Sequence, residues 1–244
     1  LELEIHHGDY VSETSGPINI TSDEQIFSMQ LDRSSSQVSV NAGVTLTTQH
    51  DIKLLAGTLI NAGTIENDGF KNIELILRNQ NGSSVFQNSG DATFDDGITV
   101  QGASINNSGN LSTAGNLLMS DGANLTNSAS GANALNVSNL IASNSSVTNS
   151  GNLNASVDAA FSNQSTFTNS GTATIANNLT LQNSDLSNPG TLNAANLSAS
   201  DADLSNSGTA TIANDVTLQN SDLSNSGTLN AANLSASDAD LSNS

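Results

Sequence analysis

The 244-residue chain contains no cysteine and no tryptophan, and its four basic residues stand against 23 acidic ones, for a formal net charge of −19. Without cysteine it forms neither disulfides nor thiolate metal sites. With so few cations it cannot neutralise many phosphates, so we expect it to bind neither nucleic acid nor an anionic membrane surface. Aromatic residues make up 3% of the chain, which leaves few rings for stacking on bases or sugars.

The chain also lacks an apolar run of 18 residues, and we therefore expect no insertion into a membrane. All four basic residues lie in the first third, and beyond Arg78 the ionisable side chains are scattered aspartates. Hydrophobic residues amount to 35% and charged residues to 11%. Disordered acidic chains are richer in charge and have few regularly placed apolar residues, so the spacing of the apolar residues becomes the deciding observation.

What the chain does contain is an internal repeat built around the motif Asn-Ser-Gly. Most copies follow one another at intervals of 18 to 22 residues. Residues 171–206 align with residues 208–243 at an offset of 37 residues, so two versions of the unit alternate. A unit of this length is too short for the helix pairs of helical solenoids. The asparagines that begin the motif, near matches included, are Asn41, Asn61, Asn88, Asn107, Asn127, Asn149, Asn169, Asn188, Asn206 and Asn225.

Large apolar residues occupy the same places in successive units. Within a unit they are two apart, as in Ala173-Thr-Ile175, which is typical of strands with one buried face. Large and small residues alternate between neighbouring units, as the layers of a stacked core require. The main column, two residues before the repeated asparagine, reads Leu59, Phe86, Ile105, Leu125, Val147, Phe167, Leu186, Leu204, Leu223 and Leu241. Two further columns read Leu179, Leu197, Val216 and Leu234, and Leu181, Ala199, Leu218 and Ala236.

These spacings predict an all-β fold, a parallel β-helix (β-solenoid) of about ten rungs of roughly 19–20 residues each, with an N-terminal cap. We expect the glycine of each motif to form a corner with positive φ, which glycine adopts without strain. Identical side chains on successive rungs of a parallel coil stack into ladders. We expect one such ladder at Asn178, Asn196, Asp215 and Asn233.

The two ends of the repeat differ in composition. Residues 1–37 hold most of the glutamates and do not fit the unit, so we predict that they form the N-terminal cap, with a short strand at residues 1–5. Residues 38–244 form the predicted shaft. The sequence stops within the repeat, at Leu241-Ser-Asn-Ser244. We therefore expect the tandem repeat to continue beyond this sequence, or its open rung to meet another copy.

The shaft resembles that of the filamentous-haemagglutinin-like bacterial surface adhesins and exoproteins. The resemblance covers roughly residues 38–244 and rests on degenerate rungs such as Asn-Ser-Gly-Thr-Ala-Thr-Ile-Ala-Asn, at 169–177 and 206–214, and on the absence of cysteine. It implies an extracellular rod at the bacterial cell surface that mediates attachment, cell contact or the building of a biofilm matrix. The partners it implies are a host or neighbouring-cell surface, a glycan or a matrix polymer.

One group of side chains points to a metal. Six aspartates lie near the main apolar column of the last four rungs, and residues i and i+2 of a strand share a face. Stacked carboxylates repel one another unless water, salt or a cation screens them, and carboxylate oxygens favour Ca²⁺. The group is either a weak Ca²⁺ site or a solvated acidic face that keeps the rod soluble, and we expect no other cofactor. Its members are Asp185, Asp201, Asp203, Asp222, Asp238 and Asp240.

An enzyme and an ice-binding protein are the remaining alternatives. Parallel β-helices also carry carbohydrate-active enzymes, and Asp201 and Asp203 could supply the two carboxylates of a glycosidase. Because the same pair recurs as Asp238 and Asp240, a repeated structural role is favoured and we expect no enzyme. Ice binding needs a flat array of Thr-x-Thr, and only one threonine column is continuous.

The sequence therefore favours the structural shaft of a secreted cell-surface adhesin or fibre. The alternative is an extracellular filament subunit that associates end to end through its open C-terminal rung, because unpaired strand edges recruit further strands.

Overall fold

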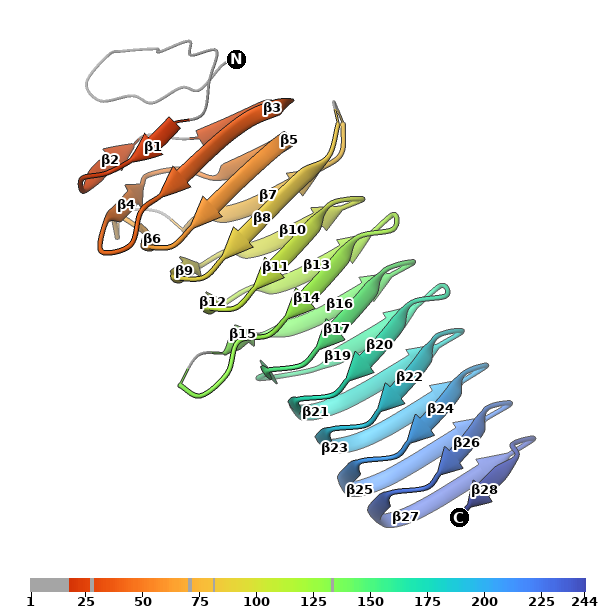
Figure 1. The fold of residues 1–244 in the computed structure, drawn as a ribbon. Coiled ribbons are helices and arrows are strands. Elements are labelled where there is room, and N and C mark those ends of the chain that lie inside the picture. The colour runs from red at the N-terminus through yellow and green to blue at the C-terminus, as the bar shows by residue number, and fades with distance from the viewer. Residues whose placement is uncertain (1–17, 27–28, 70–71, 81, 133) are drawn as a thin grey trace.

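The structure, a computed structural model, describes residues 18–26, 29–69, 72–80, 82–132 and 134–244. All regular elements among these residues are β-strands, which form one 28-stranded parallel array. They coil into a β-solenoid of about 11 turns. Figure 1 shows the turns stacked along one axis, from the red strands near the N-terminus to the blue strands near the C-terminus. The predicted fold class is confirmed, and the number of turns is close to the number of rungs predicted.

Each turn has three sides, and each strand pairs with the equivalent strand of the next turn. The strands of side 1 end on the asparagine of the motif in most turns. Side 1 consists of β1 (Ile18–Ile20), the second halves of β3 (Met29–Val40) and β5 (Ile52–Asn61), β8 (Ser84–Asn88), β11 (Ser104–Asn107), β14 (Asn124–Asn127), β17 (Ser146–Asn149), β20 (Thr166–Asn169), β22 (Asp185–Asn188), β24 (Asp203–Asn206), β26 (Asp222–Asn225) and β28 (Leu241–Asn243).

Sides 2 and 3 follow in that order along the chain and are joined into single bent strands in the last turns. Side 2 consists of β2 (Glu24–Ile26), β4 (Thr45–Thr48), β6 (Thr64–Asn67), β9 (Asp91–Phe94), β12 (Asn110–Thr113), β15 (Leu135–Val137), β18 (Asn152–Ala155) and the first halves of β21 (Thr172–Gln182), β23 (Thr191–Ser200), β25 (Thr209–Gln219) and β27 (Thr228–Ser237). Side 3 consists of the first halves of β3 and β5, then β7 (Glu74–Arg78), β10 (Gly97–Gln101), β13 (Asn116–Ser120), β16 (Asn139–Ser143), β19 (Ala159–Ser162) and the second halves of β21, β23, β25 and β27.

The local sequence explains the bent strands. In β25, Ala210 and Ile212 are buried and the threonines around them are exposed, the alternation of a half-buried strand. The pairing register then shifts between Ile212 and Asp215, and the buried positions resume at Val216. This shift turns the chain from side 2 to side 3 while the strand continues.

The residues predicted to share a column are paired in register. In the main column, Phe167 pairs with Leu186, Leu186 with Leu204, and Leu204 with Leu223. Leu181 and Ala199 pair as a large residue opposite a small one. These side chains are almost fully buried, and burying one leucine contributes roughly 1.5–3 kcal/mol to stability. The stacked core predicted from the spacing is confirmed.

Phenylalanine supplies two ring contacts within the core. The rings of Phe161 and Phe167 are stacked, with centroids 4.9 Å apart and planes inclined by 7°, whereas Phe86 and Phe94 meet edge to face at 6.2 Å. All four side chains are buried. The buried rings thus pack against one another in the two geometries that aromatic pairs prefer.

The motif glycines are required for a reason other than the one predicted. Gly43 has φ 76°, but the motif glycines from Gly63 onward do not have positive φ. A Cβ placed on Gly208 would lie 2.1 Å from the carbonyl oxygen of Gly190, and Gly171 and Gly190 show the same close approach to the preceding rung. The expectation of positive φ is therefore wrong for these glycines. They are needed because, in these rungs, a Cβ would collide with the backbone of the preceding rung.

The left-handed backbone conformation occurs at another corner, between sides 3 and 1, and is adopted mainly by asparagine and aspartate. Asn183, Asp201, Asn220 and Asp238 have φ between 48° and 54°. Short polar side chains tolerate this conformation better than other non-glycine residues do. Gly102 occupies the equivalent corner with φ 63°.

Parallel pairing reaches back to the start of the described chain. β1 pairs with residues Val38–Val40 of β3, and β2 pairs with β4. The short strand predicted at residues 1–5 lies outside the described residues. The division into a cap at 1–37 and a shaft at 38–244 stays a prediction, although β1, β2 and the first half of β3 are already paired to the turn that follows.

Candidate functional site

An uninterrupted row of asparagine side chains runs through the solenoid along the motif corner. In each step, Nδ2 of one asparagine donates to Oδ1 of the asparagine on the next turn, at 2.7–2.8 Å. All but the last are buried. We call this row the inner ladder: Asn61, Asn88, Asn107, Asn127, Asn149, Asn169, Asn188, Asn206, Asn225 and Asn243.

The inner ladder was missed in the sequence, where the motif asparagines were interpreted as corner residues. The signal was present, because each asparagine lies two residues after a main-column side chain and so points to the same, inward face. The ladder begins at Asn61, because Val40 rather than Asn41 pairs with it. Asn41 is exposed, so its assignment to the repeated asparagine column was wrong.

A second ladder of amides and carboxylates runs along the surface of side 3, in the opposite direction. Here the later turn donates to the side-chain oxygen of the earlier one. The asparagines donate through Nδ2, as from Asn196 Nδ2 to Asn178 Oδ1 at 2.9 Å and from Asn233 Nδ2 to Asp215 Oδ1 at 2.8 Å, and the two aspartates donate through their backbone N–H. The predicted column is confirmed and is longer than predicted. This outer ladder consists of Asn116, Asn139, Asp158, Asn178, Asn196, Asp215 and Asn233.

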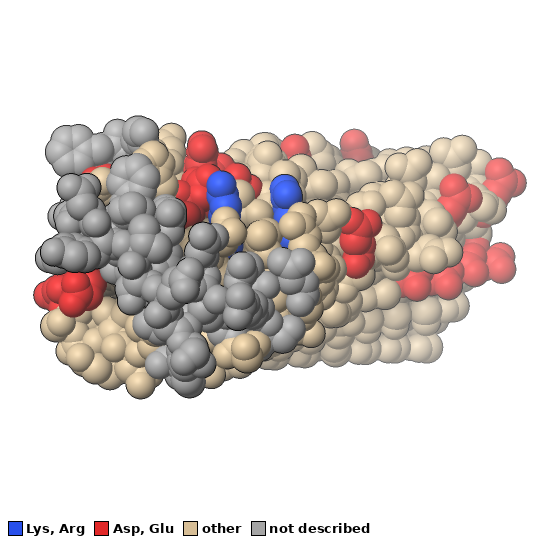
Figure 2. Space-filling view, turned by 90° about the horizontal axis from the view of Figure 1, so that it is seen from above, with Lys and Arg blue, Asp and Glu red and all other residues tan. Residues whose placement is uncertain are grey.

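Four of the six predicted calcium ligands form one exposed column on side 1. Asp203 pairs in register with Asp222, and Asp185 Oδ1 and Asp222 Oδ1 accept hydrogen bonds from the backbone N–H of Asp203 and Asp240, at 3.4 and 3.2 Å. We call Asp185, Asp203, Asp222 and Asp240 the aspartate column. Figure 2 shows acidic side chains gathered toward the end of the rod away from the grey atoms.

The other two predicted ligands, Asp201 and Asp238, do not share a strand face with this column. They lie at the left-handed corner, so the argument from i and i+2 spacing was wrong for them. Asp201 Oδ1 accepts a hydrogen bond from Asn220 Nδ2 at 2.5 Å, and amides alternate with carboxylates at this corner from Asn183 to Asp238. Among the described residues, no three histidine, aspartate or glutamate side chains are grouped as they would be around a metal ion. Calcium binding stays a prediction.

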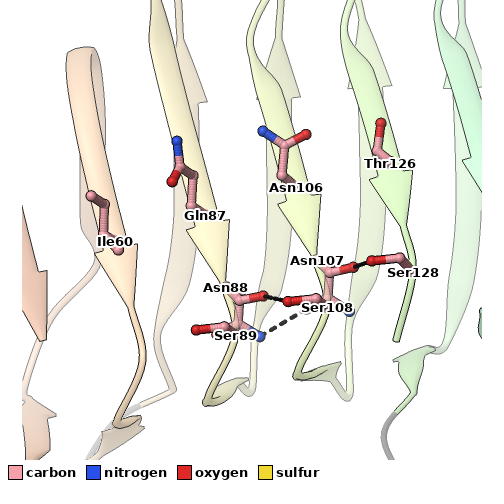
Figure 3. A pocket seen from close by; sticks show the side chains of 9 residues that line it. All are labelled: Ile60, Gln87, Asn88, Ser89, Asn106, Asn107, Ser108, Thr126 and Ser128. Atoms are coloured by element: carbon pink, nitrogen blue, oxygen red, sulfur yellow. Dashed lines mark hydrogen bonds between the residues drawn. The ribbon is translucent and has the colours of Figure 1, made fainter. Parts of the chain in front are cut away.

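A shallow groove of about 400 Å³ crosses side 1 near its N-terminal end. Figure 3 shows Gln87, Asn106 and Thr126 along one edge and serines of the motif along the other. Ser108 Oγ donates to the carbonyl oxygen of Asn88 at 3.3 Å, which fixes this edge. No titratable side chain lines the groove, and it therefore offers hydrogen bonds without a general acid or base.

The threonine column of side 2 is also in register. Thr172, Thr191, Thr209 and Thr228 are paired in succession. The neighbouring outward column alternates between threonine and asparagine. The surface is thus regular, but it is not a uniform Thr-x-Thr array.

Comparison of the chain with family models, curated proteins and solved structures gives no significant match. The part of the chain that the structure describes contains no helix long and apolar enough to cross a membrane.

Proposed function

We propose that this chain is the structural shaft of a secreted bacterial cell-surface adhesin or fibre, which mediates attachment, cell contact or matrix building. The observation that carries the proposal is the inner ladder, which continues without a break from Asn61 to Asn243. From Asn61 onward, successive turns repeat the same apolar column and the same amide contact, so the solenoid extends along its axis by addition of equivalent turns. At about 4.8 Å per turn, such a rod spans about 50 Å.

Several surface features support a spacer over a catalytic domain. The groove on side 1 is shallow and uncharged. In the last four rungs, the aspartate column has one carboxylate per rung, and the left-handed corner has one aspartate in every second rung. Such recurrence is expected of a repeated surface, whereas a catalytic pair of carboxylates occurs once. The resemblance to filamentous-haemagglutinin-like proteins supports an extracellular location and a partner on a host cell, a neighbouring cell or a matrix polymer.

A second candidate, a filament subunit, is favoured by the last rung. Leu234 and Leu241 are 48% and 51% exposed, although they belong to columns that are buried in the preceding turns. Asn243 Oδ1 accepts the last hydrogen bond of the inner ladder, from Asn225 Nδ2. This surface fits a further parallel rung, either of the same chain or of a second copy.

The repeat itself supplies the test of the shaft role. Deletion of residues 171–207 removes two rungs and joins Ser170 to Gly208, which restores the Asn-Ser-Gly motif. We expect a folded rod shortened by about 10 Å in electron micrographs, with unchanged attachment of displaying cells to a matrix-coated surface. A deletion of 28 residues, 171–198, breaks the register and serves as the control that should not fold. Loss of attachment in the folded two-rung deletion would contradict a spacer role.

The filament alternative is tested separately by sedimentation of the chain over a range of concentrations. Concentration-dependent fibres that disappear on Leu241→Asp would favour it, since a charge at the open rung prevents stacking. Monomers at all concentrations would exclude it.

A further inference from the structure

Arg78 is an unusual side chain in this rod. It is the last residue of β7 and pairs in register with Gln101 of β10. Its Nε is enclosed and has no hydrogen-bond partner, the one such buried side-chain nitrogen or oxygen among the described residues. A buried donor without an acceptor is unfavourable, and such groups call for an explanation by a missing water, ion or ligand.

The guanidinium borders a hollow of about 370 Å³ at the corner between sides 3 and 1. Gly102 contributes no side chain to this hollow, whereas later turns place asparagine or aspartate at this left-handed corner. A Cβ on Gly102 would be 3.3 Å from the carbonyl oxygen of Asp121 and 3.7 Å from Cβ of Asn79. The residues that line the hollow are Arg78, Asn79, Gln80, Gln101, Gly102 and Asp121.

Most of the lining groups are already oriented. Asn79 Oδ1 accepts from the backbone N–H of Ser84 at 2.7 Å, and its Nδ2 donates to the carbonyl oxygen of Gly102. Gln101 Nε2 donates to Asp121 Oδ2 at 2.7 Å. These bonds leave Gln101 Oε1 and the second oxygen of Asp121 as acceptors beside the unpaired guanidinium.

The other cationic side chain that the structure describes, Lys53, differs from Arg78 in having a partner. Lys53 lies 4.0 Å from a carboxylate oxygen of Asp51, so its charge has a partner. Figure 2 shows two cationic side chains close to each other, in a surface with more acidic than basic side chains. Among the described side chains, Arg78 is therefore the cation without a partner, in a hollow lined by polar side chains and a glycine.

We propose that the Arg78 hollow binds the carboxylate of an acidic sugar. The guanidinium binds the carboxylate with paired, charge-assisted hydrogen bonds, and a small rotation of its planar group brings the enclosed Nε–H to the same acceptor. Gln101 Oε1 and Asp121 accept hydrogen bonds from sugar hydroxyls. The hollow has no apolar lining residue, which favours a hydroxyl-rich ligand over an apolar acid. This site is independent of the proposed shaft role.

The test is a titration of the ¹⁵N-labelled full chain with glucuronate, followed by NMR. The chain has two arginines, Arg33 and Arg78, so the Nε–H signal of Arg78 is assigned by its loss in Arg78→Gln. We expect this signal to shift with glucuronate, and binding to weaken at least about tenfold in Arg78→Gln. Glucose and acetate at the same concentration should shift it much less.

Two variants separate binding from folding. Gly102→Asn fills the hollow with the residue that equivalent corners carry, such as Asn183 and Asn220, and should abolish the shift while the chain melts as before. Lys53→Gln removes the same charge elsewhere and should bind like the parent chain. No shift with glucuronate, an equal shift with glucose or acetate, or full binding by Gly102→Asn would each overturn the proposal.

Discussion

Asn107 Nδ2 donates a hydrogen bond to Asn127 Oδ1 at 2.8 Å, inside the core and across the boundary between two turns. The same relationship recurs along the inner ladder, always in the same direction. Each amide between the two ends of the ladder is thereby both donor and acceptor, and these buried amides are satisfied by one another. The ladder fixes how far each turn is rotated relative to the next, since a slip by one residue would place the asparagine outside.

The first prediction concerns the inner ladder. Asn107→Asp replaces an amide that donates to Asn127 Oδ1 and to the carbonyl oxygen of Gly109 by a carboxylate, which cannot donate. A buried uncompensated charge costs about 3–5 kcal/mol, so we expect a large fall in the free energy of unfolding in urea. The neighbouring Asn106→Asp adds the same charge on the exposed face and should be nearly neutral. Equal effects of the two would contradict the buried ladder.

The second prediction concerns the close approach of rungs at the motif glycine. Gly208→Ala would place Cβ 2.1 Å from the carbonyl oxygen of Gly190, so adjacent rungs must separate. We expect destabilisation by about 1–3 kcal/mol, as for overpacked cores. Ser207→Ala, on the exposed neighbouring residue, is the control. A melting temperature of Gly208→Ala equal to that of the control would show that the corner has room.

The chain itself offers one exception to this rule. Ala129 occupies the glycine position of its motif and is fully buried. In that turn the backbone N–H of Ser128 still donates to the carbonyl oxygen of Asn107, as in other turns. After Ala129 the chain makes a longer connection to β15 than the corresponding connections of the neighbouring turns.

The third prediction concerns the main column. Leu204 is 4% exposed and pairs with Leu186 and Leu223. Leu204→Asp buries an unpaired charge between them, and we expect the neighbouring rungs to unfold. Ser205→Asp, next in sequence but exposed, should leave the circular-dichroism melt unchanged. A melt of Leu204→Asp that matches the parent chain would disprove the core assignment.

The fourth prediction concerns the aspartate column. Like charges on paired strands repel, and Asp203 is paired directly with Asp222. We expect Asp203→Asn with Asp222→Asn to raise the melting temperature at low salt, and the gain to disappear near 1 M NaCl, where charges are screened beyond about 3 Å. A calcium site gives the opposite sign: millimolar Ca²⁺ would stabilise the parent chain more than Mg²⁺ does, and the double variant would lose that gain.

The order of the apolar residues was sufficient to predict the fold. Apolar residues two apart within each unit predict strands with one buried face, and a unit of about 19 residues predicts one turn of a coil. A parallel coil is the arrangement that then buries every main-column leucine, from Leu186 to Leu223. The same reasoning placed Asn178 and Asn196 in one column. Because register within a strand is set by which face is buried, such columns follow directly from the printed sequence.

Other features depend on distances between turns, which no single unit contains. Three findings follow from how one turn packs on the next. Gly208 lies close to the backbone of Gly190, and Asp201 lies at a left-handed corner and not on a strand. Gly102 lines a hollow beside Arg78. The inward orientation of the Asn107 side chain is only partly predictable from the sequence. Its spacing of two residues from Ile105 predicts that it points inward. Only the stacked turns, however, supply the amide partners that make a buried asparagine stable.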